Sequence, residues 1–166
     1  FSSRRDDSII FLEGGEVFLH PNYKDMLRML RDVEYCIVSN GQFPNRIAEA
    51  AESFGIKRIS FSLDGPKETY QKVRGIDGFD NLMQTIDLLK GQTDIHINST
   101  ISPWNGYEDL KWVSKFCSDN GFKHAIQPMY PINFFDTNKC NIFDYYFDVS
   151  DFLENTSFIG NTLDYF

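Results

Sequence analysis

The sequence is poor in cysteine, and its three cysteines, Cys36, Cys117 and Cys140, are far apart. So few thiols predict no disulfide framework, and we expect a reducing, cytoplasmic setting. No two of them have metal-knuckle spacing, so they predict no zinc or iron–sulfur site by themselves. Cys36 and Cys117 fall in apolar stretches, where a free cysteine is usually a packing residue, and Cys140 is an isolated candidate ligand.

Long apolar runs and an excess of basic charge are also missing. No stretch reaches the roughly 18 apolar residues of a membrane-spanning helix, and the polar opening at Phe1 is unlike a signal peptide. The sequence has 16 basic and 24 acidic side chains, which gives a net charge of -8. This balance argues against nucleic-acid binding, which depends on clustered Lys and Arg. Because the chain opens without a methionine, we expect it to be a piece of a longer protein.

The residues that are present form a repeating pattern of strands and helices. Five short apolar runs end at turn formers, which predicts buried strands, and one-sided apolar stripes between them predict amphipathic helices. The strand runs are 9–12, 35–38, 58–63, 94–101 and 124–129, and the stripes are 26–33, 47–54, 79–89 and 110–117. This order predicts an α/β fold with parallel strands, either an open doubly wound sheet or a closed or partial barrel.

Polar residues gather where the strand runs end. Both architectures bind ligands at the carboxyl ends of their strands, so these residues are candidates for a site; the alternative is that they are ordinary polar turns. They are residues 13–16, 39–41, 62–65, 98–100 and Gln127. The pattern stops near residue 131. We therefore divide the chain into a core, 1–131, and an aromatic C-terminal segment, 132–166, that packs on the core or leads to a missing domain.

Four motifs along residues 9–131 resemble those of radical S-adenosylmethionine (radical SAM) enzymes. Gly14-Gly15-Glu16, followed by Leu19-His20-Pro21 opening a helix, resembles the end of their second strand, although Val17 stands where Pro is usual, and Ser39-Asn40-Gly41 resembles the end of their third. Ser60 to Pro66 resembles the fourth strand, and Val73-Arg74-Gly75 with Gly78-Phe79 resembles the helix entry that follows. The resemblance is to the subgroup that modifies peptides or builds cofactors and often carries auxiliary clusters in a C-terminal domain.

This resemblance implies a partial (β/α)6-type, TIM-like barrel with outer helices. It implies two cofactors, S-adenosyl-L-methionine and a [4Fe–4S] cluster, and reductive cleavage to a 5′-deoxyadenosyl radical that takes hydrogen from a peptide or cofactor-precursor substrate. It also implies an electron donor such as ferredoxin or flavodoxin, and neither a nucleic-acid nor a membrane partner. The family's Cys-x3-Cys-x2-Cys cluster motif is absent from the 166 residues. We therefore expect that motif elsewhere in the protein and no activity from this piece alone.

The resemblance also implies a set of cofactor-binding residues. Gly14 and Gly15 lack Cβ, so backbone can approach the ligand's ammonium group beside the counter-charge of Glu16. Arg74 can form bidentate hydrogen bonds with the ligand's carboxylate, and Ser62 can add a hydroxyl donor. The remaining candidates are Ser39, Asn40 and Asn98 for ribose hydroxyls or the carboxylate, and Gln127 for adenine. No catalytic side chain or metal ligand is assigned.

Each assignment has a plainer alternative. Gly14-Gly15 can be an ordinary strand-to-helix turn, and Arg74 can pair on the surface with Glu68 or Asp77. Asn40 can cap the next helix and Asp64 its own turn, while His96 is more simply structural. For the whole protein, the alternatives are a non-catalytic barrel that binds a partner and an α/β enzyme whose glycines face a phosphate. Glu16 argues against the phosphate, because its charge repels an anion.

Overall fold

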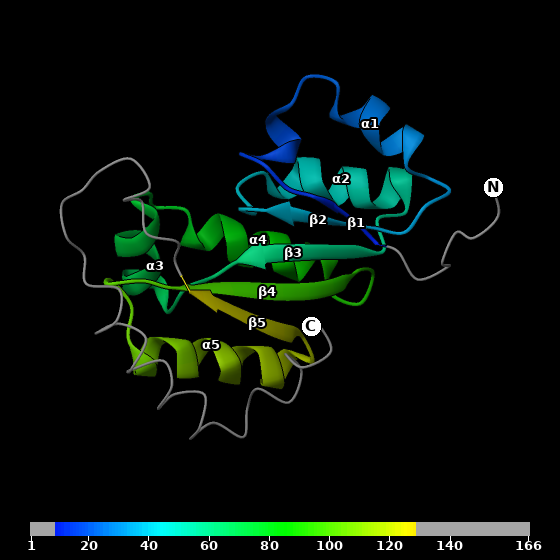
Figure 1. The fold of residues 1–166 in the computed structure, drawn as a ribbon. Coiled ribbons are helices and arrows are strands. Elements are labelled where there is room, and N and C mark those ends of the chain that lie inside the picture. The colour runs from blue at the N-terminus through cyan, green and yellow to red at the C-terminus, as the bar shows by residue number, and fades with distance from the viewer. Residues whose placement is uncertain (1–8, 129–166) are drawn as a thin grey trace. The chain divides into compact units, whose positions relative to one another are not determined.

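The structure is a computed structural model that describes residues 9–128. Figure 1 shows parallel strands alternating with helices, in the strand order β1-β2-β3-β4-β5. The strands are β1 (Ile10–Leu12), β2 (Tyr35–Ser39), β3 (Arg58–Ser62), β4 (Asp94–Ile101) and β5 (Lys123–Pro128). The helices are η1 (Val17–Leu19, a 3-10 helix), α1 (Tyr23–Met29), α2 (Pro44–Phe54), α3 (Lys67–Arg74), α4 (Phe79–Leu89) and α5 (Tyr107–Asn120). The predicted fold class, α/β with a parallel sheet, is confirmed.

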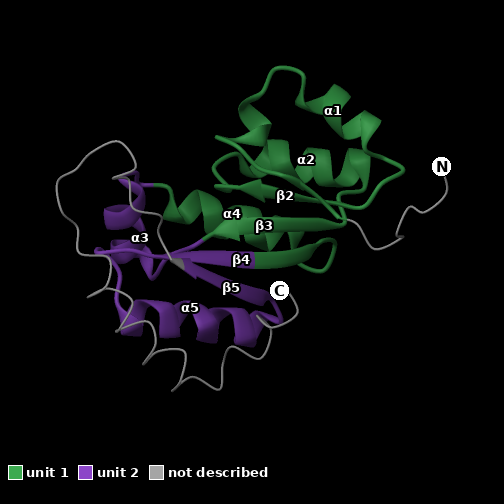
Figure 2. Cartoon of the chain, viewed as in Figure 1, with its two compact units in different colours: residues 1–62, 78–96 green, residues 63–77, 97–166 purple. Residues whose placement is uncertain are grey.

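The chain divides into two compact units, coloured in Figure 2. Unit 1 comprises residues 1–62 and 78–96, and unit 2 comprises residues 63–77 and 97–166. The predicted boundary between 131 and 132 lies outside the described residues, as do the aromatic segment and Cys140. None of the described helices is long and apolar enough to cross a membrane.

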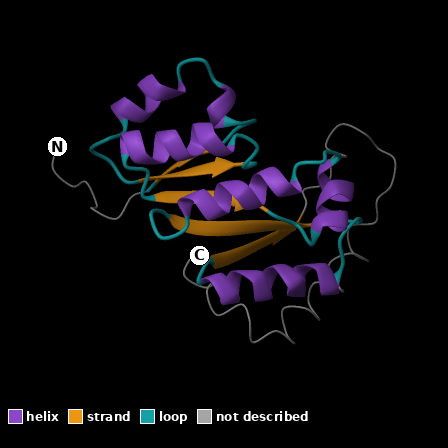
Figure 3. Ribbon diagram, turned by 180° about the vertical axis from the view of Figure 1, so that it is seen from behind, coloured by secondary structure: helices purple, strands orange, loops and turns teal. Residues whose placement is uncertain are grey.

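Unit 1 has a hydrophobic layer between its strands and its helices. Ile37, Ile59 and Phe61 are fully buried, and α2 packs against α4 on the helical side, as Figure 3 shows from behind. Gly41, just after β2, has φ +70°, and a Cβ there would lie 2.5 Å from Cδ1 of Leu82 in α4. A side chain at this position would therefore be strained and would also collide with the core. The glycine allows β2 to turn directly beneath α4.

The two described cysteines are packing residues, as predicted. Cys36 and Cys117 are buried and unpaired. Burial raises the pKa of the Cys36 thiol to about 11 and that of the Cys117 thiol to about 12. Both thiols stay protonated at neutral pH, which makes them poor nucleophiles and poor metal ligands.

Unit 2 contains a buried histidine that links β4, β5 and α5. The hydroxyl of Ser99 donates to the carbonyl of Leu63 (2.6 Å), so its oxygen is left to accept from Nε2 of His124 (2.8 Å). Nδ1 of His124 then accepts from the Ser114 hydroxyl at 2.9 Å. The neutral tautomer with its proton on Nε2 satisfies all of these groups. Burial lowers the pKa of His124 from 6.5 to about 4.

Acid is expected to destabilise the protein through His124. Between pH 6.5 and about pH 4 the unfolded chain binds a proton that the folded chain does not, so the free energy of unfolding falls as the pH is lowered through this window. The loss is about 3 kcal/mol, and the group has no such effect above pH 6.5. Urea unfolding at several pH values measures it. In His124→Gln this part of the pH dependence should vanish; an unchanged slope would contradict the assignment.

Two helix predictions need correction. The stripe 26–33 predicted a helix to Val33, but α1 ends at Met29, and Val33 is exposed because tight turns follow the helix. The motif Leu19-His20-Pro21 predicted a helix opening, but α1 begins at Tyr23 after the short η1. His20 is extended, as expected for a residue before proline, so the α-helix starts only beyond Pro21.

Candidate functional site

Glu16 of unit 1 ties the loop after β1 to the end of β2. Its Oε1 accepts from the backbone N–H of Phe18 (3.2 Å), which makes it the N-cap of η1, and its Oε2 accepts from the N–H of Asn40 (2.8 Å). The Ser39 hydroxyl lies 3.1 Å from both carboxylate oxygens. The structure thus brings three predicted site residues, Glu16, Ser39 and Asn40, into direct contact.

Ser39 positions Glu16 rather than facing outward. Its side chain is buried, and its oxygen also accepts from the backbone N–H of Gly41 at 3.1 Å. The hydroxyl proton is therefore shared with the Glu16 carboxylate, and the oxygen is occupied as an acceptor. Ser39 was predicted to contact ribose hydroxyls or the carboxylate of the ligand; the geometry favours instead an indirect role through Glu16.

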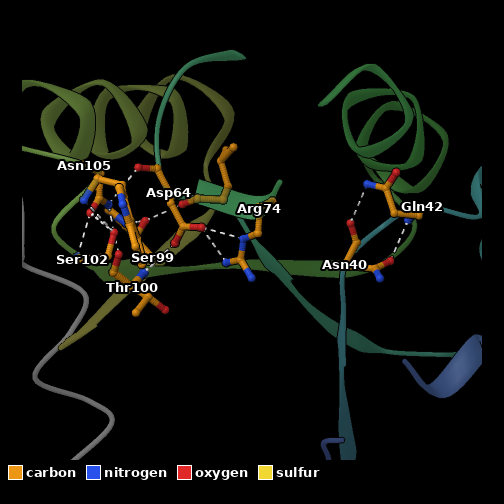
Figure 4. A network of polar contacts seen from close by, with 11 residues as sticks. Asn40, Gln42, Asp64, Arg74, Ser99, Thr100, Ser102 and Asn105 are labelled. Atoms are coloured by element: carbon orange, nitrogen blue, oxygen red, sulfur yellow. Dashed lines mark hydrogen bonds and ion pairs between the residues drawn. The ribbon is translucent and has the colours of Figure 1, made fainter. Parts of the chain in front are cut away.

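Asn40 presents its side-chain amide nitrogen. Its Oδ1 accepts from the N–H of Gln42 (3.0 Å), and its carbonyl accepts from Nε2 of Gln42 (3.2 Å), so the residue is fixed from both ends (Figure 4). Its Nδ2 has no partner among residues 9–128. The helix-cap alternative is wrong, because α2 has Phe43 as its N-cap and no side-chain cap.

The backbone at Gly14 and Gly15, next to Glu16 in the sequence, is exposed. Gly14 has φ +143°, and a Cβ at either glycine would meet no atom within 4 Å. Packing therefore does not explain these glycines, and the backbone they expose is accessible to a ligand. At the end of β3, Ser62 is half-buried, and its hydroxyl has no partner within the described part of the chain.

In unit 2, Arg74 pairs with a carboxylate that sequence reasoning missed. Its Nε and Nη2 both lie 2.6 Å from Oδ2 of Asp64, which is fully buried (Figure 4). The surface pairing proposed with Glu68 or Asp77 is wrong; Asp77 instead contacts Gln71. The turn-cap reading of Asp64 is also wrong, because its Oδ1 accepts from the N–H of Thr100 in β4 (2.7 Å).

Asn105 holds this arrangement together. Its Nδ2 donates to the carbonyls of Asp64 and Thr100, both at 3.0 Å, and its Oδ1 accepts from the backbone and hydroxyl of Ser102. The loop before α5 is thereby locked to the residues that hold Arg74. The one indication of this arrangement in the sequence was Asp64, which directly follows the predicted strand 58–63.

The other predicted residues of unit 2 are accessible. Asn98 is half-buried, its carbonyl accepts from the N–H of Leu63 at 3.0 Å, and its side-chain amide has no partner within the described ranges. Gln127 is exposed near the end of β5. His96 of unit 1 is buried and joined through Nε2 to Asp94 at 3.1 Å, which fits its predicted structural role.

The described residues form no metal site, and two hollows of unit 1 do not include the predicted cofactor-binding residues. Across residues 9–128, no cluster of His, Cys, Asp and Glu side chains has the arrangement of a metal site. Two hollows of unit 1, of about 420 and 250 Å³, contain none of the predicted cofactor-binding residues. The first is lined by residues of η1, α1 and α2, including His20 and Arg46, and the second by residues around Tyr35 and Phe54.

Most of the chain, including these strand-end motifs, matches the model of a known protein family. Residues 2–117 match the family model described as the radical SAM superfamily. The chain belongs to this superfamily. Its cofactors are therefore S-adenosyl-L-methionine and a [4Fe–4S] cluster, and the three-cysteine motif for that cluster is not within the 166 residues.

One curated protein is similar in sequence, and two solved structures are similar in fold. The chain is 27% identical over 117 residues to the GTP 3′,8-cyclase of Aliarcobacter butzleri (strain RM4018), covering 67% of this chain and 36% of the cyclase. It matches the structure titled "Native anSMEcpe with bound AdoMet" with a TM-score of 0.60 and 18% identity, over 88% of this chain and 47% of that one. For "Native anSMEcpe with bound AdoMet and Kp18Cys peptide" the TM-score is 0.61, with 18% identity and coverage of 93% and 48%. The chain thus spans less than half the length of these relatives.

The residues fit S-adenosylmethionine. In unit 1, open glycine backbone lies next to the Glu16 carboxylate, whose orientation is fixed by hydrogen bonds, an arrangement that suits an ammonium group. In unit 2, Arg74 is part-exposed with both N–H groups of Nη1 unpaired within the described part of the chain, which suits a carboxylate. Polar groups on Asn40, Ser62 and Asn98 that have no partner among residues 9–128 are available to bind hydroxyl groups.

Proposed function

We propose that the chain is the S-adenosylmethionine-binding core of an enzyme that removes a hydrogen atom from a peptide or cofactor-precursor substrate. The observation that carries this proposal is the Glu16 carboxylate, which is held by Ser39 and Asn40 next to open glycine backbone. When bound and reduced by one electron, S-adenosylmethionine supplies the organic radical for this chemistry. The chain's own residues bind and orient the ligand.

Unit 1 provides the ammonium contacts in this proposal. The backbone of Gly14 and Gly15 approaches the ammonium group, and Glu16 supplies the opposite charge. Asn40 and Ser62 offer an amide and a hydroxyl to the ribose or to the carboxylate. Ser39 acts by holding Glu16, since its own hydroxyl is already engaged.

Unit 2 provides the cation for the ligand's carboxylate. Arg74 supplies it, Asn98 adds a polar contact, and Gln127 lies on the strand proposed to border adenine. A peptide substrate is suggested by the similar structure whose title names a bound Kp18Cys peptide, and an electron donor such as ferredoxin or flavodoxin supplies the electron. The competing function is a barrel that binds a partner without chemistry.

The function is tested with the complete protein, reconstituted anaerobically with iron and sulfide. Dithionite and S-adenosylmethionine should yield 5′-deoxyadenosine, detected by liquid chromatography and mass spectrometry. Two serines on one face of β3 then test the site. Ser62→Ala should weaken binding several-fold, as expected for one lost hydrogen bond, whereas Ser60→Ala should not, because Ser60 is buried and its hydroxyl has no partner in the described part of the chain.

The outcomes separate the two functions. Binding of S-adenosylmethionine without cleavage would favour the scaffold, and absence of binding would contradict both the enzyme and its site. Equal effects of Ser62→Ala and Ser60→Ala would remove the end of β3 from the site.

A further inference from the structure

Asp64 is a buried acid with an unusual set of partners. Its side chain is fully buried at the end of β3, yet it touches the part-exposed Arg74 through two 2.6 Å contacts to one oxygen, Oδ2. The other oxygen accepts from the N–H of Thr100, and Asn105 holds the Asp64 carbonyl. Figure 4 shows the contacts of the Arg74 guanidinium with Asp64 as dashed lines. The carboxylate is therefore fixed by the backbone of unit 2 before it meets the arginine.

The contact uses one edge of the guanidinium and leaves another free. Nε and one N–H of Nη2 point to Asp64, so both N–H groups of Nη1 and the second N–H of Nη2 have no partner among the described residues. The side chain is 30% exposed, so this edge is accessible. An edge formed by Nη1 and Nη2 presents two parallel donors, the geometry that a carboxylate accepts.

We propose that Asp64 is a positioning residue that aims the free edge of Arg74 at the carboxylate of S-adenosylmethionine. The inference rests on the proposed function and adds to it a residue that no comparison assigns. An arginine side chain is long and loses conformational freedom on binding. Because Asp64 has already fixed Arg74, little of that loss remains when the ligand binds.

The chemistry requires a carboxylate at position 64. In Asp64→Asn, the amide oxygen can still accept from the N–H of Thr100, which preserves the link to β4. The amide nitrogen then faces the guanidinium, so donor meets donor and Arg74 turns away. The substitution therefore releases Arg74 while keeping the size and the backbone contact of the side chain.

The experiment is calorimetric titration of the complete, cluster-loaded protein with two ligands. S-adenosylhomocysteine carries the carboxylate, and its decarboxylated analogue does not. Asp64→Asn should weaken S-adenosylhomocysteine binding about tenfold and change binding of the analogue less than about twofold. The control Thr69→Val removes a hydrogen bond to Asp109 in the same unit and should change neither affinity.

A second readout observes the arginine itself. The Nε–H signal of Arg74 in nitrogen-15 NMR should be protected from exchange in the parent protein and should lose that protection in Asp64→Asn. Equal losses for both ligands, or a protected signal in Asp64→Asn, would overturn the positioning role. If Arg74→Lys weakens binding of the carboxylate ligand but Asp64→Asn does not, the inference fails and the proposed function stands. If the parent protein binds neither ligand, both fail.

Discussion

Glutamine in place of Glu16 is expected to lower the free energy of unfolding by about 2–4 kcal/mol and to abolish measurable binding of S-adenosylmethionine. Both oxygens of Glu16 accept from backbone N–H groups, Oε1 from Phe18 and Oε2 from Asn40. An amide has only one oxygen, so its nitrogen must face one of these donors. The turn that carries Gly14 and Gly15 then loses its anchor on β2, and the ligand's ammonium loses its counter-charge.

Urea unfolding and calorimetry measure the two effects of Glu16→Gln. Hydrogen exchange adds a local test, because the amide of Asn40 should exchange faster in this variant. Glu49→Gln is the matched control in the same unit. Among the described residues Glu49 forms an exposed ion pair with Lys24, so this substitution should leave both stability and affinity nearly unchanged. A stable Glu16→Gln protein with parental affinity would show that the carboxylate is neither anchor nor counter-charge.

Alanine in place of Arg74 is expected to weaken S-adenosylmethionine binding by about 1.5–3 kcal/mol, the value of a charged hydrogen bond. It should also lower the free energy of unfolding by about 3 kcal/mol, because Asp64 is fully buried and would lose its cation. Two different measurements, calorimetry of the cluster-loaded protein and urea unfolding, separate these effects.

A double substitution distinguishes a binding role for Arg74 from a purely structural one. Arg74→Ala with Asp64→Asn removes the buried charge together with its partner, so much of the lost stability should return while the affinity stays low. Recovery of the affinity along with the stability would mean that Arg74 supports the fold and does not touch the ligand.

The strands could be predicted because each carries its own signal. Ile37, Ile59 and Phe61 are buried members of short apolar runs, and such runs occur at every strand of the structure. Helix α3 was not visible in the periodicity, because Tyr70 is its one buried residue. The end of α1 was misplaced because Val33 keeps the helical spacing although the chain has already left the helix.

The site was predictable in its motifs and not in its internal contacts. The Gly-Gly-Glu turn and the strand-end Ser-Asn-Gly could be found in the sequence, and Glu16 does contact Ser39. The role of Asp64 could not be found, since its partners Arg74 and Thr100 are 10 and 36 residues away along the chain. Hydrogen bonds over such separations depend on the fold, and nearby acids such as Asp77 were the more obvious partners.

A crystal structure of the complete protein with S-adenosylmethionine bound tests the account most directly. It should show the ligand's ammonium group at the backbone of Gly14 and Gly15 beside Glu16, with Ser39 and Asn40 still bound to the Glu16 carboxylate. A ligand seated elsewhere, for example in the hollow beside His20 and Arg46, with Glu16 and Arg74 free of contact, would contradict it.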